Sequence, residues 1–178
     1  MDAVLTRSQL VAWRTAIFVI FFATGLGFAT WASRIPSVKA DLGVNDFEVG
    51  LLLFASGAAS ILGLSLANIV LARWGARRGL LSGIGTFAVG FLLVGLGADL
   101  LASYPLTAAG LAIMGLGMGS TDVMMNVEGA AIEKASGRTI MPLFHALFSL
   151  GTVAGAGVGV AMTAWHVSVA PHLWIIGA

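Results

Sequence analysis

An acid and an amide lie within an apolar stretch in the second half of the chain. In GLGMGSTDVMMNVEG, residues 115–129, a long apolar segment leads to Asp122, and Asn126 follows one helical turn later. An acid at the centre of a membrane helix costs about 2.5 to 3.5 kcal/mol, so it is expected to face the bundle interior or a water-filled cavity. Desolvation there favours the neutral form, which allows the group to alternate between protonated and charged states. A proton-coupling site requires that behaviour.

The surrounding residues leave an alternative open for this acid. Four residues share one stripe of a helix, at i, i+4, i+7 and i+11: Gly115, Gly119, Asp122 and Asn126. If the helix ends early, Asp122 is merely interfacial, because it lies ~25 Å along the helix from Pro105, toward the cytoplasmic side. Glu128 and Glu133 follow and are expected to be solvated loop or interface charges.

Other polar and aromatic residues complete the candidate set. His145, three residues after Pro142, either pairs with Asp122 or is a solvated or packing histidine. Trp31 is either an interfacial anchor or a platform on which a sugar stacks. Thr24 is the first residue of the polar part of the first helix, and we count it among the candidate substrate-binding residues. Arg34 is expected to be a loop charge that snorkels to the interface.

The elements that position these residues are membrane helices. The chain is 58% hydrophobic and only 10% charged, and four charge-free runs of 19 to 24 residues cover 15–33, 49–72, 79–98 and 100–121. About 20 residues cross a hydrocarbon core. The sequence therefore predicts an all-α membrane protein with five complete transmembrane helices and the start of a sixth, at about 12–33, 47–72, 79–98, 104–126, 142–164 and 171–178.

The loop charges predict an orientation. With a cytoplasmic amino terminus, the inner side collects seven basic residues, and only Arg34 and Lys39 lie outside. The seven are Arg7, Arg14, Arg73, Arg77, Arg78, Lys134 and Arg138. This satisfies the positive-inside rule and indicates a multi-pass protein of the cell membrane. No basic patch suited to nucleic acid is present.

An internal repeat is the next expectation. TGLGFAT at 24–30 matches MGLGMGS at 114–120 at an offset of 90, and LFASGAASILG at 53–63 resembles LFSLGTVAGAG at 147–157 at an offset of 94. With three helices per unit the copies must be inverted, which is an architecture of secondary transporters. The alternative is chance similarity between glycine-rich apolar segments.

Enzyme chemistry finds no support in the sequence. It offers no nucleophile–base pair, metal-ligand set or cofactor motif, and GLGMGS and GAGVGV lack the glycine order of a nucleotide-binding turn. We therefore expect neither catalysis, nor a metal, nor a cofactor.

These residues resemble the amino-terminal half of a major facilitator superfamily transporter across essentially the whole chain. The resemblance rests on the six-span order, on FFATGLGFATWASRIP, and on the basic loop LARWGARRG, in which Arg73, Gly75 and Arg77 fit the family signature and Arg78 follows. Within the superfamily the chain is most similar to the fucose-permease-like branch, on account of the acid, three residues and Asn at 122–126 and of LFSLG at 147–151. The resemblance implies that the basic residues of the loop belong to a cytoplasmic gate.

The sequence also departs from that pattern. Asn68 and Ala72 replace the Gly and Asp of the loop signature, so the charge thought to latch the gate is missing. Proton-driven drug exporters of this superfamily carry an arginine on their fourth transmembrane helix, and this sequence lacks it. Drug export is therefore a weaker interpretation than solute symport. The first helix lacks the polar cluster of fucose permeases, which puts fucose itself in doubt.

The resemblance implies a proton-coupled symporter of a small polar, sugar-like solute that works by alternating access. In this interpretation Asp122 takes part in protonation and sugar binding, Asn126 and His145 lie near the pocket, and the partners are the solute, H+, the bilayer and a missing carboxy-terminal half or second copy. The alternatives are a truncated, non-transporting membrane protein or assembly partner, and a drug or metabolite exporter of the same superfamily.

Overall fold

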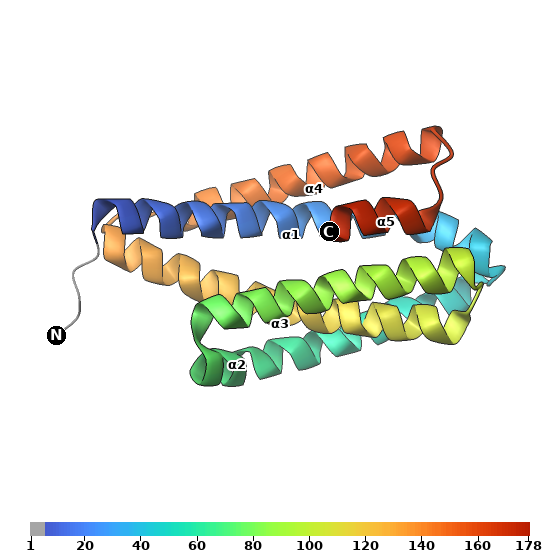
Figure 1. The fold of residues 1–178 in the computed structure, drawn as a ribbon, viewed down its shortest axis with the longest axis horizontal. Coiled ribbons are helices and arrows are strands. Elements are labelled where there is room, and N and C mark those ends of the chain that lie inside the picture. The colour runs from blue at the N-terminus through green and yellow to red at the C-terminus, as the bar shows by residue number, and fades with distance from the viewer. Residues whose placement is uncertain (1–5) are drawn as a thin grey trace.

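The computed structural model describes residues 6–178, and every regular element within them is a helix. The elements are α1 (Arg7–Leu42), α2 (Asp46–Gly95), a π-helical segment η1 (Leu96–Leu100), α3 (Tyr104–Ser136), α4 (Met141–Ala164) and α5 (Val169–Gly177). Figure 1 shows them aligned along one long axis, with α5 ending midway along the bundle. The all-α membrane bundle expected from the sequence is confirmed.

The long helix α2 contains a chain reversal at Gly75. This residue has φ 72° and ψ 169°, a backbone conformation that is essentially restricted to glycine. The segments before and after it run antiparallel, as the green turn in Figure 1 shows. Four described helices are long and apolar enough to cross a membrane, and one of them is the 55-residue stretch Asp46–Leu100. Because Gly75 divides that stretch in two, residues 6–178 contain five segments long and apolar enough to cross a membrane.

Replacing Gly75 with alanine is therefore expected to destabilise the fold. A Cβ meets no atom within 4 Å there, so the cost is backbone strain alone, on the order of 1–3 kcal/mol. Gly85 also has open space around it but carries no positive φ. Gly85→Ala is the matched control and should leave the midpoint of thermal unfolding in detergent nearly unchanged. Equal midpoints for the two variants would contradict a strained reversal.

The bundle has two ends with different charge. The amino end holds the start of α1, the Gly75 reversal and the α3–α4 connection, and the far end holds the α1–α2, η1–α3 and α4–α5 connections (Figure 1). All seven basic residues that the loop analysis assigned to one side lie toward the amino end, and Arg34 and Lys39 lie toward the far end. The charge asymmetry inferred from the sequence is therefore present in the folded bundle.

Two helices extend beyond their predicted ends. α1 was expected to end at 33 but continues through Pro36 to Leu42, and α3 was expected to end at 126 but continues to Ser136. Each ends at a glycine in the left-handed conformation, Gly43 with φ 64° and Gly137 with φ 63°. The segments that the sequence indicated as connections, from 34 and from 127, are thus largely helical.

Glycines let two pairs of helices approach at backbone distance. A Cβ on Gly25 of α1 would overlap the Phe148 carbonyl oxygen of α4, and one on Gly155 of α4 would overlap that of Leu26. Between α2 and α3 the same relation holds: Gly115 faces the Ser56 carbonyl oxygen, and Gly63 faces that of Leu116. Small residues drive such association because lipid supplies no hydrophobic force between helices.

These contacts are related by constant offsets along the chain. Gly25 and Leu26 of α1 correspond to Gly115 and Leu116 of α3, which lie 90 residues later in the sequence. An offset of 92 converts Ser56 and Gly63 of α2 into the α4 residues Phe148 and Gly155. An inverted three-plus-three repeat produces such exchanged pairs. The register between the second and fifth helices is therefore 92, and the value of 94 read from the sequence is wrong by two residues.

Candidate functional site

The acid predicted to carry the chemistry lies in the second half of α3. Asp122 is partly buried, and within residues 6–178 its carboxyl group takes part in no ion pair. His145 of α4 lies close enough for its charge to act on Asp122, although no hydrogen bond joins the two. The His145 ring is exposed and packs edge-on against Phe21, with ring centroids 5.4 Å apart and planes at 79°. Asp122 and His145 are therefore near each other, but they are not hydrogen-bonded.

Asn126 is tied to its own helix. Its side-chain Nδ2 donates to the backbone carbonyl oxygen of Asp122 at 2.8 Å. Such a bond to the preceding turn fixes the amide along the helix and leaves the Asp122 carboxyl group free. On the same stripe, Gly115 and Gly119 face the Ser56 and Ser60 carbonyl oxygens of α2. The glycine part of the stripe therefore serves packing, and its polar part begins at Asp122.

Trp31 is a core residue. Only 5% of it is exposed, and it belongs to the apolar cluster at the far end of the bundle. It also lines a cavity of about 260 Å³ between α1, α2 and α3, together with the hydroxyl-bearing Ser56 and Ser60. This burial rules out the interfacial-anchor interpretation, because an anchor exposes its ring at the bundle surface. The position on a cavity wall is compatible with stacking on a small molecule.

Thr24 lines a different cavity. Its hydroxyl group donates to the Ile20 carbonyl oxygen at 2.7 Å, and 8% of the residue is exposed. The cavity, about 280 Å³, lies between α1, the second segment of α2, α3 and the end of α5, and is almost entirely apolar. Phe87 and Met118 line both this cavity and the one beside Trp31. Asp122 lines neither, so the structure does not gather the predicted substrate residues around one pocket.

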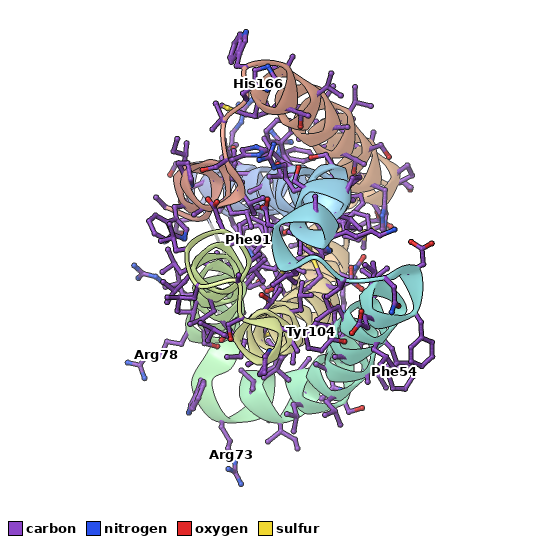
Figure 2. All side chains as sticks on the ribbon, turned by 90° about the vertical axis from the view of Figure 1, so that its right-hand side faces the viewer. Phe54, Arg73, Arg78, Phe91, Tyr104 and His166 are labelled. Atoms are coloured by element: carbon purple, nitrogen blue, oxygen red, sulfur yellow. The ribbon has the colours of Figure 1, made fainter. Side chains whose placement is uncertain are left out.

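The residues predicted for the gate lie together at the amino end. Arg73, Arg77 and Arg78 surround the Gly75 reversal and are exposed. Figure 2, seen from the far end, shows Arg73 and Arg78 pointing away from the bundle. Arg77 also lines a cavity of about 490 Å³ between α1, α2 and α3. The arginines predicted for the gate therefore lie apart from Asp122 and its neighbours Asn126 and His145.

The two glutamates after Asp122 have structural partners that the sequence did not indicate. Glu128 accepts a hydrogen bond of 2.7 Å from Trp13 Nε1, which links α3 to α1 and lies on the wall of the cavity beside Arg77. Glu133 accepts two bonds of 2.8 Å, from the backbone N–H groups of Ile140 and Met141 at the start of α4. Of the expected solvated loop or interface charges, the loop part is wrong for both residues, because α3 continues as a helix and carries them against neighbouring elements.

Arg34 is likewise not a snorkelling loop charge. It lies inside α1 and only 2% of it is exposed. Its guanidinium group donates to Thr163 Oγ1 at 3.0 Å and to the Val167 carbonyl oxygen at 2.6 Å. Pro36, two residues later, lies inside α1 and does not end the helix.

Comparison with known proteins identifies relatives of this chain. The family model described as Major Facilitator Superfamily matches residues 17–178. An uncharacterized MFS-type transporter of Yersinia pestis is 42% identical over 89% of this chain and 39% of its own length. An uncharacterized transporter of Sinorhizobium fredii is 31% identical over 95% of the chain and 44% of its own. The membrane protein MosC of Rhizobium meliloti is 31% identical over 79% and 34%.

The chain thus spans about two fifths of the length of these relatives. No solved structure matches it. The family match begins within α1 and continues through the Gly75 reversal to the end of α5, so it contains every predicted site residue from Thr24 to His145. On this evidence the chain belongs to the major facilitator superfamily of membrane transporters.

Proposed function

We propose that the chain is the amino-terminal part of a proton-coupled secondary transporter that moves a small polar, sugar-like solute by alternating access. The observation that carries the proposal is Asp122: an acid on a membrane-spanning helix, partly buried, without an ion-pair partner in residues 6–178, and close to His145. An intramembrane acid of this kind is costly and is typically retained for ion or proton transfer.

Proton coupling follows from the position of this acid. When charged, Asp122 favours a conformation in which water reaches it, and when protonated it tolerates one in which water is excluded. Because Asn126 bonds the Asp122 carbonyl group rather than its carboxylate, the carboxylate can exchange its proton and contact a hydroxyl-bearing solute. We assign His145 to the rim of this site, where it contacts solvent.

Alternating access also needs surfaces that slide. At the glycine contacts between α1 and α4 and between α2 and α3, no glycine side chain stands between the two backbones. Relative rocking of such repeats is a general mechanism of secondary transport. We further propose that the transporter is completed by a carboxy-terminal half or a second copy of the chain. The seven basic residues at the amino end favour a cytoplasmic amino terminus in the cell membrane.

The test is solute-driven proton movement. The protein, expressed at full length and reconstituted in proteoliposomes with a pH-sensitive dye inside, is presented with a panel of monosaccharides and polyols. One class of solute is expected to acidify the lumen, and an uncoupler should abolish the signal. Protein-free liposomes are the control. Solute uptake that proceeds at the same rate with and without a proton gradient would contradict coupling.

A further inference from the structure

Arg34 is a buried cation without an ionic partner. Among residues 6–178 no carboxylate lies within ion-pair distance of its guanidinium group, which is bound only by the neutral oxygens of Thr163 and Val167. Its Nε–H is buried and has no hydrogen-bond partner in the described part of the chain. Removing a cation from water costs several kcal/mol unless an anion and further hydrogen bonds offset it. The site therefore lacks an anionic acceptor.

The nearest acids do not supply that acceptor. Asp41 lies seven residues, or about two turns, after Arg34 on α1. It is exposed and therefore solvated, although its charge interacts with Arg34. Asp99 of η1 is engaged elsewhere, since its Oδ2 accepts the backbone N–H of Ala170 at 2.9 Å. His172 of α5, close enough for electrostatic interaction with Arg34, is fully buried, and both of its ring nitrogens lack partners.

A cavity lies directly beside Arg34. Its volume is about 230 Å³, and it opens at the far end between α1, the end of α4 and the α4–α5 connection. Besides Arg34 and Asp41, the lining includes hydrogen-bonding side chains of Ser37, Thr163, His166 and Ser168. His166, which lines the cavity, is exposed and stands at the edge of the molecule in Figure 2.

The start of α5 adds a second positive element. Ser168 and Val169, which line the cavity, are the N-cap and first residue of the nine-residue helix α5, and the Ser168 side chain forms no capping bond. The N-terminus of a helix carries a partial positive charge, which favours anions. One N–H of this first turn, that of Ala170, is already bonded to Asp99 Oδ2. The guanidinium group and the helix start therefore meet at the same cavity.

We propose that this cavity binds a small carboxylate-bearing molecule, with Arg34 as its anchor. A guanidinium group presents planar N–H donors that match the two oxygens of a carboxylate. Thr163 Oγ1 and the Val167 carbonyl oxygen each accept one N–H of the two terminal nitrogens, Nη1 and Nη2, and the second N–H of each terminal nitrogen remains for the two oxygens of the ligand. A volume of about 230 Å³ accommodates a molecule of a few carbon atoms.

The site is distinct from the proposed proton site. Phe21, which contacts His145, precedes Arg34 by thirteen residues on α1. Thirteen residues at 1.5 Å each correspond to roughly 20 Å along the helix. The carboxylate site therefore lies about that far from Asp122 along the bundle, and it does not depend on proton coupling or on the identity of a transported solute.

The experiment measures acetate binding to the purified protein in nanodiscs by ligand-observed saturation-transfer NMR. Acetamide, of the same shape without charge, and chloride at equal ionic strength are the matched probes. Acetate should give a saturation-transfer effect that levels off as the acetate concentration rises. Acetamide should give no effect, and chloride should leave the acetate signal largely unchanged. Equal signals from acetate and acetamide, or full displacement by equimolar chloride, would overturn the proposal.

Variants assign the signal to the cavity. Arg34→Lys keeps the charge but loses the planar fork, and should weaken acetate binding by about tenfold or more. Asp41→Asn removes an exposed negative charge at the rim, and should strengthen binding by roughly two- to fivefold. Asp41 is exposed, so this variant folds even if a change at Arg34 does not. Acetate binding that is the same in wild type and Asp41→Asn, or the same in wild type and folded Arg34→Lys, would place the anion elsewhere and refute the assignment.

Discussion

Asp122→Asn is expected to eliminate proton-driven solute accumulation while leaving solute exchange across the membrane. The amide has nearly the same shape and hydrogen-bonding capacity as the neutral acid but cannot release a proton. The helix keeps the Asn126 bond to the backbone carbonyl group at position 122, because that bond does not use the side chain. We expect initial rates of gradient-driven uptake to fall on the order of a hundredfold.

Two assays on the same proteoliposomes separate coupling from binding. Uptake is measured with and without an inward proton gradient, and counterflow is measured with solute on both sides and no gradient. Asp46→Asn is the matched control, because Asp46 is an exposed acid whose partner is Lys39 at the far end. It should retain gradient-driven uptake. A variant Asp122→Asn that still accumulates solute against its gradient would exclude Asp122 as the coupling residue.

The second large effect is expected at the reciprocal glycines. In Gly115→Ala the new Cβ overlaps the Ser56 carbonyl oxygen, and in Gly25→Ala it overlaps that of Phe148. Both obstacles are backbone atoms, so a helix must shift, and overpacking of this kind costs about 1–3 kcal/mol or more. The two variants should lower the thermal unfolding midpoint by similar amounts, because the inverted repeat makes the two sites equivalent.

Glycines that face open space provide the comparison for this prediction. Gly57 on α2 and Gly157 on α4 have no neighbouring atom within 4 Å of an added Cβ. Alanine there should be neutral or slightly stabilising, since alanine is the better helix former. The midpoints are read from tryptophan fluorescence in detergent. If the Gly57→Ala and Gly115→Ala midpoints coincide, the close helix contact does not hold α2 and α3 together.

Much of the fold was predictable because its causes are local. A charge-free run of about 20 residues has few alternatives to a membrane helix, and the pattern of basic residues survives folding unchanged. The boundaries were less predictable. Pro36 and the charges after Asn126 resemble loop signals, but α1 and α3 continue until Gly43 and Gly137 adopt the left-handed conformation.

The candidate site was predictable only in part. The type and spacing of Asp122 and Asn126 predict a functional acid, which stays a prediction, and the structure places His145 near Asp122. The sequence did not indicate that Trp31 and Thr24 line separate cavities. It also gave no sign that the side chain of Arg34 turns inward, since the orientation of an arginine near a helix end depends on the partners that other elements bring to it.

By itself, the sequence determined the number of apolar segments long enough to cross a membrane and the asymmetry of charge between the two ends. These properties follow from composition along one dimension, which folding cannot alter. Tertiary structure alone decided the register of the repeat, the partners of Glu128 and Glu133, and the burial of Arg34. Each of these depends on contacts between helices far apart in the chain, where a shift of one or two residues changes which atoms meet.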